Sequence, residues 1–356
     1  MPLMIYFDHA ASTPLHPLVY ASLKESLLND FANPSAPHAL GRALAKRIDN
    51  ARLQLLQSLK ADSKQYMVIF TASATESNNL LIHSATNSSC IYSNADHPSM
   101  VVPASKTKKG GESHSVHHLL THVNNTSGLI LPIEEISAKL KQDNPSCFIH
   151  VDAAQSFKKF PISLTSGTID SLTLSAHKCG GPKGVAALII KQNQKQKLLP
   201  LFFGGDHEGG LRPSTLNTPL ILAWEKIFSL ALPDVSPIAS INQFLREKLS
   251  EKKMHFHFPF SPENHSPYIL LLATPKIPSD IIVRHLEQKE IYLSSAAACS
   301  SKIRGNNPTF HALGIEEKLH KHILRLSFSA ATTNSEAEEF AQTLIAIVEE
   351  LSRLRL

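Results

Sequence analysis

The chain has 356 residues, of which 42% are hydrophobic and 18% are charged. This length exceeds what one compact core normally fills, and the composition excludes disordered and fibrous proteins. The net charge of +5 comes from 35 basic and 30 acidic residues that are interspersed. No basic run indicates a nucleic-acid surface, so we expect no direct contact with nucleic acid.

The first residues, MPLMIYFDHAAS, lack the regions of a signal peptide, and no segment approaches about 18 uninterrupted apolar residues. We therefore expect no membrane association. The four cysteines lack the short paired spacing of a metal ribbon, an iron–sulfur ligand set or a disulfide framework. The SHSVHH segment (113–118), with His114, His117 and His118, itself contains no acid or cysteine, which favours an exposed strand over a metal site. We expect no metal and a cytoplasmic location.

Apolar runs alternate with helical patterns through the first two thirds of the chain. Runs typical of short buried strands occupy 65–71, 89–94, 146–153, 171–175 and 184–191, and helical spacing occupies 74–85 and 132–142. Repeats of strand, helix and strand predict a mostly parallel sheet with helices on both faces. Ligands bind beyond the carboxyl ends of such strands, so the residues after each run are the candidates for function.

The pattern changes after residue 232, where LPDVSPIAS is rich in proline and serine. The segments that follow predict strands at 255–260, 267–273, 291–295 and 324–329, and helices at 278–290 and from about residue 334. We predict an α/β chain with a large domain over 15–232. A smaller α+β domain is expected over 233–356, together with 1–14.

The most informative segment is SLTLSAHKCGGPKG, in which Lys178 follows the end of a predicted strand at Ser175. Desolvation at a strand end lowers the pKa of a lysine ammonium and frees the amine to form a Schiff base with a carbonyl cofactor. A single lysine beside glycines is more often a surface residue. The assignment of Lys178 as a cofactor-binding lysine therefore needs support from other segments.

That support comes first from HVDAAQ, where Asp152 ends a predicted buried strand. A buried carboxylate is costly unless it meets a positive partner, and the protonated nitrogen of a pyridine ring is such a partner. An aspartate at that nitrogen keeps the ring cationic and electron-withdrawing. Gln155 could donate to the ring hydroxyl, although an Asp-x-x-Gln pattern alone is more often a turn or a helix cap.

Two further segments carry polar residues after predicted strands. In FTASATESNN, the backbone N–H groups of Ala74 and Thr75 and the Thr75 hydroxyl would form an anion site at a helix start, suited to a phosphate. An ordinary capping box based on Ser73 or Thr75 is the alternative. In SNADHPSM, His97 could stack on an aromatic cofactor and move protons, although a lone histidine is more often structural.

Nine segments together resemble the cysteine desulfurases of the class V aminotransferase superfamily, which have pyridoxal-phosphate fold type I. They are YFDHAASTP, FTASATESNN, ADHPSM, HVNN, HVDAAQ, SAHKCGGPKG, GGDHEGGLRPST, SSAAACSS and LRLSFS. The resemblance spans nearly the whole chain, and its lysine and cysteine segments are the most specific. It implies pyridoxal 5'-phosphate as cofactor, L-cysteine as substrate and a homodimer with the active site near the subunit boundary.

The resemblance also implies roles for individual residues. Lys178 would carry the cofactor, Asp152 and Gln155 would bind its ring nitrogen and hydroxyl, and His97 would stack on the ring. Ala74, Thr75, Ser175 and His177 would hold the phosphate, joined by Thr215 of the other subunit. Asn125 would lie beside the ring and the substrate, and Asn33 and Arg325 would bind the substrate carboxylate.

The remaining role falls to Cys299, which would take the substrate sulfur as a persulfide and pass it to an acceptor protein for iron–sulfur cluster assembly or tRNA thiolation. Its neighbours, SSAAACSSKIRGNNP, have the composition of a mobile loop. The length of this loop before FHALG resembles the longer-loop branch, which includes the iron–sulfur-assembly enzymes. Cys90 and Cys147, inside apolar runs, are better candidates for structural cysteines.

The sequence departs from the family pattern at three places, which bear on the reaction rate and on loop geometry but not on cofactor binding. Ala297 stands in a run of alanines where a Gly-Ser pair is usual, Thr126 follows HVNN in place of an acidic residue, and Ala72-Ser73 replaces Ser-Gly. Two alternatives stay open. Another class V enzyme, such as a selenocysteine lyase or an aminotransferase, would need no sulfur-accepting cysteine. A weakly active paralogue would act as a binding partner in sulfur transfer.

Overall fold

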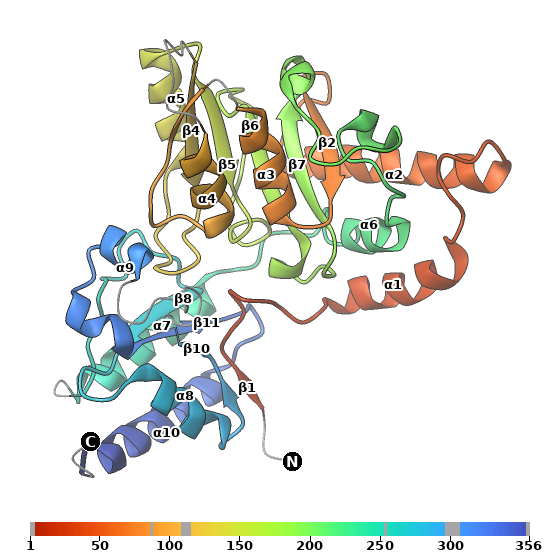
Figure 1. Cartoon of the computed structure of the whole chain (residues 1–356). Helices are drawn as coiled ribbons and strands as arrows, with labels where there is room; N and C mark the ends of the chain where they lie inside the picture. Colours follow the sequence, from red (N-terminus) through yellow and green to blue (C-terminus); the bar gives the residue numbers. More distant parts are fainter. Residues whose placement is uncertain (1–3, 86–87, 108–114, 253–254, 296–306, 354–356) are drawn as a thin grey trace. The chain divides into compact units, whose positions relative to one another are not determined.

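The structure, a computed structural model, describes residues 4–85, 88–107, 115–252, 255–295 and 307–353 (Figure 1). The chain divides into two compact units. Unit 1 comprises Met1–Ser12, Val123–Ile130 and Pro233–Leu356, and unit 2 comprises Thr13–His122 and Leu131–Leu232. The sequence does not separate 123–130 from the large domain, yet this segment groups with unit 1. None of the described helices combines the length and apolar character needed to cross a membrane.

Unit 2 is built on a six-stranded sheet in the order β2-β7-β6-β5-β4-β3. The strands are β2 (Tyr66–Thr71), β3 (Ser89–Ile91), β4 (Val116–Thr121), β5 (Phe148–Asp152), β6 (Ser171–Ser175) and β7 (Ala186–Lys191). The neighbours β3 to β6 pair in parallel, whereas β7 is antiparallel to both β6 and β2. The predicted fold class, a mostly parallel sheet, is confirmed, and β2 runs in the same direction as β6.

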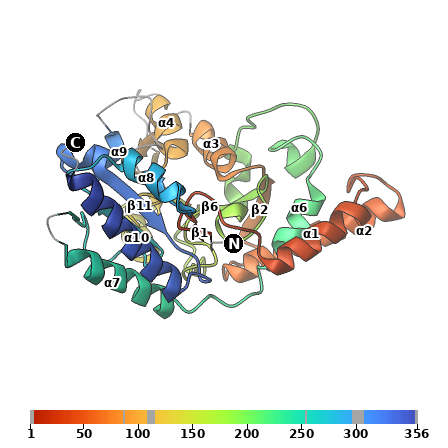
Figure 2. The same cartoon turned by 90° about the horizontal axis from the view of Figure 1, so that it is seen from below.

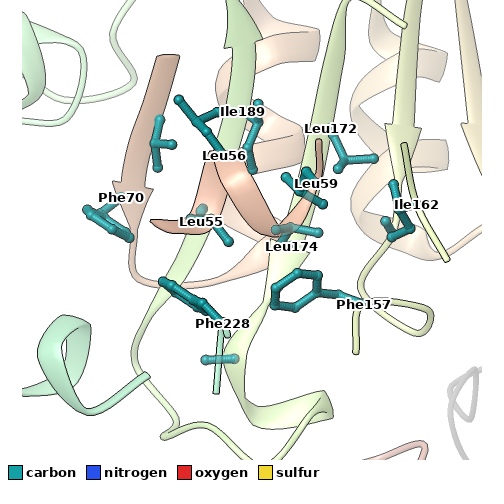
Figure 3. Close-up of a cluster of buried hydrophobic side chains, with 14 of the residues drawn as sticks. Leu55, Leu56, Leu59, Phe70, Phe157, Ile162, Leu172, Leu174, Ile189 and Phe228 are labelled. Carbon is teal, nitrogen blue, oxygen red and sulfur yellow. The ribbon is translucent and has the colours of Figure 1, made fainter. Parts of the chain in front are cut away.

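Helices cover both faces of this sheet, as Figure 1 shows. They are α2 (Ala39–Ser58), α3 (Ala74–Ser84), α4 (Pro98–Lys106), α5 (Ile133–Asp143) and α6 (Thr218–Glu225), and α1 (Pro17–Asn29) packs on α6. Leu172 and Leu174 of β6 pack into a cluster with Leu55 of α2 on one face (Figure 3). Leu188 of β7 packs with Leu80 of α3 on the other face. Each such buried leucine stabilises the fold by about 1.5–3 kcal/mol.

The alternation of side chains along β5 decides where polar groups lie. Ile149 and Val151 belong to the apolar cluster with α2, so His150 and Asp152 face the side covered by α3. Asn78 of α3 contacts both of these polar side chains. One face of the sheet is therefore apolar, and the opposite face carries polar groups toward the carboxyl end of β5.

Unit 1 contains a three-stranded antiparallel sheet in the order β10-β11-β8 and a parallel pair of β1 and β9. Its elements are β1 (Ile5–Tyr6), α7 (Ser236–Ser250), β8 (Ile269–Ala273), α8 (Ser279–Glu287), β9 (Ile291–Tyr292), β10 (Ser294–Ser295), α9 (Pro308–Ala312), β11 (Ile323–Ser327) and α10 (Asn334–Arg353). Helix α10 packs on α7 and α8 (Figure 2). The strand predicted at 255–260 is wrong: only a bridge from His257 to Ala273 forms, and Pro259 lacks the N–H that a longer ladder needs.

Candidate active site

Three of the predicted binding elements end at the same edge of the unit 2 sheet. Strands β5 and β6 are parallel neighbours that end at Asp152 and Ser175, and Lys178 follows in a short 3-10 helix, Ala176–Lys178. Strand β2 ends at Thr71 and leads into α3, which begins at Ala74. This is the carboxyl edge, where open α/β sheets bind ligands. The structure thus brings the ends of β2, β5 and β6 to one edge of the sheet.

The turn after Lys178 has a backbone shape and close contacts that favour glycine. Gly180 has a φ of +83°, a conformation that L side chains rarely adopt. A Cβ at Gly181 would lie 2.7 Å from Cβ of Ala176 and from Cδ1 of Trp224. The turn therefore packs directly on α6 without an intervening side chain, and this close contact fixes the backbone beside the lysine.

A segment far away in the sequence braces the same turn. The backbone N–H and the hydroxyl of Thr13 both donate to the carbonyl of His177, each at 3.0 Å. The N–H of Gly180 donates to the Thr13 hydroxyl at 2.9 Å, and the N–H of His16 donates to the Gly180 carbonyl at 2.8 Å. Sequence reasoning missed this role of Thr13, for which the only signal is a hydroxyl residue before a proline.

Asp152 is 6% exposed, and its carboxylate accepts hydrogen bonds from a backbone amide and from a helix side chain. The N–H of Ala154 donates to its Oδ1 at 2.9 Å, and Nδ2 of Asn78 donates to its Oδ2 at 2.8 Å. Gln155 is buried in the turn that follows. The carboxylate is thus held in one orientation by a backbone amide and a helix side chain.

The start of α3 combines a cap with an exposed hydroxyl. Ser73 is the N-cap, and its hydroxyl accepts the N–H of Glu76 at 3.1 Å. The Glu76 carboxylate accepts the N–H of Ala72 at 2.8 Å and pairs with Arg212 at 3.1 Å. Thr75 is exposed and takes no part in the cap, so capping by Ser73 and anion binding by Thr75 are compatible. Arg212 offsets the negative charge that Glu76 brings to this helix start.

The other residues predicted to hold a phosphate lie on two further segments of unit 2. Ser175 is buried at the end of β6. Burial lowers the pKa of His177 to about 4, and the positive charges of Lys178 and Lys183 add to this shift. His177 is therefore neutral at neutral pH.

Thr215 is exposed in the segment that follows the glycine-rich loop. This loop is anchored by Arg52, which donates to both carboxylate oxygens of Glu208 at 2.8 and 3.0 Å. Such a bidentate pair fixes the orientation of both side chains. The loop that precedes Thr215 is consequently tied to α2, and the role of Thr215 toward another subunit stays a prediction.

His97 is the N-cap residue of α4. Its Nδ1 accepts the N–H of Ser99 at 3.1 Å and lies 2.8 Å from the Ser99 hydroxyl. Desolvation lowers the pKa of His97, Asp152 opposes this shift, and Lys178 adds to it. Asn78 donates both to Asp152 and to the Ser99 hydroxyl, and this hydroxyl contacts Nδ1 of His97, so His97 and Asp152 are linked through two side chains.

Two predicted substrate-binding residues meet within unit 1. Arg325 is 3% exposed, and its guanidinium donates to the backbone carbonyl of Asn125 at 3.0 Å. It also donates to Oδ1 of Asp8 at 2.9 Å and to the Ser294 hydroxyl at 3.2 Å. Asp8 and Ser294 could not be recognised as partners of Arg325 from the sequence, because they come from distant segments of the chain.

The other predicted substrate-binding residue belongs to unit 2. Asn33 is exposed in a turn, where its side-chain oxygen accepts the N–H of Ser35 at 2.9 Å. Cys299, the predicted nucleophile, and Ala297 lie outside the described residues.

Burial disfavours the thiolate form of the three described cysteines. Burial raises the pKa of Cys90 and of Cys147, and it raises the pKa of Cys179 to about 11. The thiolate is the nucleophilic form of cysteine, so a raised pKa disfavours all three as sulfur acceptors at neutral pH.

Residues 116–118 of the SHSVHH segment form the start of β4, whereas residues 113 and 114 lie outside the described residues. His117 is half-buried and stacks on Phe148 with ring centroids 4.7 Å apart. Burial lowers its pKa to about 4. The expectation of an exposed strand is therefore only partly correct, because His117 packs on the neighbouring strand. No cluster of three or more metal-ligating side chains occurs in the described part of the chain.

Comparisons with known proteins give one consistent picture. The sequence model of the aminotransferase class-V family matches residues 5–119 and 112–340. A mitosomal cysteine desulfurase of Trachipleistophora hominis is 31% identical over 390 residues, which cover 98% of this chain and 87% of the relative. A solved structure described as SspA in complex with cysteine is 27% identical, with a TM-score of 0.74, and covers 91% of this chain and 98% of its own.

A second solved structure, a NifS-like protein from Rickettsia africae ESF-5, has a TM-score of 0.87 and 24% identity. It covers 98% of this chain and 100% of its own. This likeness concerns the fold, which matches that predicted from the strand and helix pattern.

Proposed function

Because this chain belongs to the aminotransferase class-V family, we propose that it is a pyridoxal-phosphate-dependent cysteine desulfurase, which converts L-cysteine to L-alanine. The observation that carries this proposal is the position of Lys178 and Asp152 at the ends of adjacent parallel strands, at the sheet edge where α3 also begins. An amine, a carboxylate and a helix N-terminus at one edge match the three functional ends of the cofactor.

The donor set fits pyridoxal phosphate residue by residue. Lys178 would hold its carbonyl carbon, Asp152 its ring nitrogen and Gln155 its hydroxyl. Ala74, Thr75, Ser175 and His177 would bind the phosphate, and His97 would stack on the ring. When bound, the cofactor supplies a carbonyl carbon that bonds to amines and a ring that withdraws electrons. Asp152 is suited to its task because two hydrogen bonds already fix its carboxylate.

The sulfur-accepting step is assigned to Cys299. The thiolate attacks the sulfur of L-cysteine, the carbon–sulfur bond of the substrate breaks, and the substrate carbon takes a proton to give L-alanine. The enzyme retains the sulfur as a persulfide, so the atoms balance without an added oxidant or reductant. The raised pKa values of Cys90, Cys147 and Cys179 support this assignment among the four cysteines of the chain.

Arg325 is proposed to bind the substrate carboxylate. Its buried Nε has no hydrogen-bond partner among the described residues, so the guanidinium has an N–H left to donate to a further anionic group. The guanidinium of Arg325 would then pair with the substrate carboxylate and with Asp8 together. Asn33 and Asn125 are proposed as the further polar contacts of the substrate.

A homodimer is the proposed assembly. Large apolar side chains are exposed on α1 and in the segments near it, namely Leu18 (50%), Leu27 (61%), Leu28 (73%), Phe31 (76%) and Leu40 (59%). Phe202 and Phe203 are 61% and 89% exposed. An apolar surface of this kind marks a protein interface. In a homodimer, Thr215 would complete the phosphate site of the other subunit. Light scattering on the purified protein tests whether the protein is a dimer.

The persulfide would pass to an acceptor protein in the cytoplasm, for iron–sulfur cluster assembly or for tRNA thiolation. The test of the function is to incubate the cofactor-loaded protein with L-cysteine and to measure alanine, sulfide and protein-bound persulfide together. Alanine formed in step with released and bound sulfur supports a desulfurase. Cofactor absorbance without alanine indicates a binding paralogue, and turnover of selenocysteine alone indicates a selenocysteine lyase.

A further inference from the structure

A chain of buried polar side chains connects α3 and α4 with β5 and β6. Its members are Asn78, Ser99, His150, Asp152 and Ser171, all of which are 6% exposed or less. Nδ2 of Asn78 lies 2.8 Å from Oδ2 of Asp152 and 2.9 Å from the Ser99 hydroxyl. Oδ1 of Asn78 lies 3.1 Å from Nε2 of His150, whose Nδ1 lies 2.7 Å from the Ser171 hydroxyl.

The carboxylate of Asp152 determines where the protons in this chain lie. An ionised carboxylate only accepts, so the Asn78 atom beside it is the NH₂ group and its oxygen faces His150. Nε2 of His150 must then carry a proton, and its Nδ1 accepts from Ser171. Burial lowers the pKa of His150 to about 3, which agrees with a neutral ring.

The same reasoning extends to His97 through Ser99. Asn78 donates to the Ser99 hydroxyl oxygen, which leaves the hydroxyl hydrogen to point at Nδ1 of His97. The backbone N–H of Ser99 also donates to this Nδ1. With two donors directed at it, Nδ1 cannot carry a proton, and the proton of the neutral ring lies on Nε2.

We propose that Asn78 and Ser99 are positioning residues that hold His97 as the Nε2–H tautomer. His97 then acts on its surroundings by donating from Nε2, and Nδ1 does not act as a base. This inference deepens the proposed function, on which it rests for the role of His97 beside the cofactor. The charged groups that influence this ring are Asp152 of β5 and Lys178, and neither replaces the two donors at Nδ1.

Nitrogen NMR of histidine-labelled protein tests the proposal directly. The cofactor-loaded protein and the apoprotein are both measured at neutral pH, and His97→Gln identifies the signals of His97. We expect Nδ1 of His97 to resonate as an unprotonated nitrogen and Nε2 as a protonated one. A protonated Nδ1 would overturn the proposal. Because no substrate is present, this result does not depend on whether the protein desulfurates L-cysteine.

Variants at Ser99 supply the second measurement. Ser99→Asp places an acceptor beside Nδ1, so the proton should move to Nδ1 and the Nε2–H form should be lost as the major species. Ser99→Thr keeps the hydroxyl and should retain the wild-type tautomer. Ser99→Ala removes one of the two donors and should raise the pKa of His97 in an NMR titration.

The matched control is Ser105→Ala. It removes a hydroxyl of the same helix, α4, that donates to the carbonyl of Val102. It should leave the signals of His97 unchanged. If Ser99→Ala and Ser99→Asp both folded and also left the tautomer and the pKa of His97 unchanged, Ser99 would have no positioning role.

Discussion

The N–H of Gly180 donates to the hydroxyl of Thr13 over 2.9 Å, and this bond joins the start of unit 2 to the turn that carries Lys178. The same hydroxyl donates to the carbonyl of His177 at 3.0 Å. One side chain therefore holds the backbone on both sides of the lysine. The position of the proposed cofactor-binding amine therefore depends on Thr13, a residue that takes no part in the proposed chemistry.

Replacement of this hydroxyl should loosen the lysine turn. Thr13→Val keeps the shape of the side chain but leaves the N–H of Gly180 without its acceptor. We expect a loss of about 1–3 kcal/mol in the free energy of unfolding and weaker retention of the cofactor. Denaturant unfolding and cofactor absorbance during dialysis measure the two effects. Thr13→Ser, which keeps the hydroxyl, should behave like the wild type, and equal loss in both variants would contradict this account.

Lys178 should be the site of covalent cofactor attachment. The wild-type protein should be yellow when loaded, and Lys178→Ala should lose the bound colour after dialysis. Borohydride reduction followed by peptide mass analysis should find the cofactor on Lys178. Lys183→Ala, a change in the same glycine-rich segment, is the control and should keep the attachment. Label found on another lysine would refute the assignment.

The stability of the protein should fall as the pH is lowered from about 6.5 toward 3. Burial holds the pKa of His150 at about 3, below the ordinary value near 6.5, so the unfolded chain binds a proton that the folded chain excludes. The free energy of unfolding therefore decreases on acidification through this window, by at most about 1.4 kcal/mol per pH unit for one such group. His177 and His117 shift in the same direction.

Denaturant unfolding at several pH values tests whether the free energy of unfolding decreases on acidification. His150→Gln should give a shallower dependence on pH than the wild type. His83→Gln removes an exposed histidine of α3 and serves as the control. An unchanged slope in His150→Gln would show that His150 does not contribute.

The rule that ligands bind at strand ends explains why much of the site could be found from the sequence. Apolar runs end just before Asp152 and near Ser175, and parallel neighbours place these ends together. Local patterns carry this information because strands are short and contiguous. The predicted strand at 255–260 failed because pairing partners, and not the apolar run, decide whether a ladder extends.

Contacts between distant segments could not be read in the same way. Asn78 and Ser99 lie on different helices, and their bond depends on how α3 and α4 pack on the sheet. In the sequence, Asn78 is one polar residue among several in TESNN. Asp8 likewise meets Arg325 only because β1 and β11 belong to one unit. Which side chains become partners in these contacts depends on long-range packing, and the periodicity of apolar residues in the sequence carries no information about such packing.

The decisive prediction concerns Cys299, because it separates the chemistry that the cofactor supplies from the chemistry of the thiol. Cys299→Ser should still bind the cofactor and should still change its absorbance with L-cysteine, since Lys178, Asp152 and His97 are intact. It should form almost no alanine from L-cysteine and no protein persulfide, because the hydroxyl cannot accept the sulfur atom. Alanine assays and intact-protein mass spectrometry measure both losses.

The controls for this prediction are Cys90→Ser and Cys147→Ala, which alter thiols whose pKa burial raises. Both should retain nearly wild-type turnover, because a thiol that stays protonated at neutral pH is a poor sulfur acceptor. L-cysteine must be the substrate, since selenium leaves carbon more readily than sulfur does and a selenocysteine substrate could react without the thiol. If Cys299→Ser desulfurated L-cysteine at the wild-type rate, the persulfide mechanism would be wrong, and another class V activity would explain the site better.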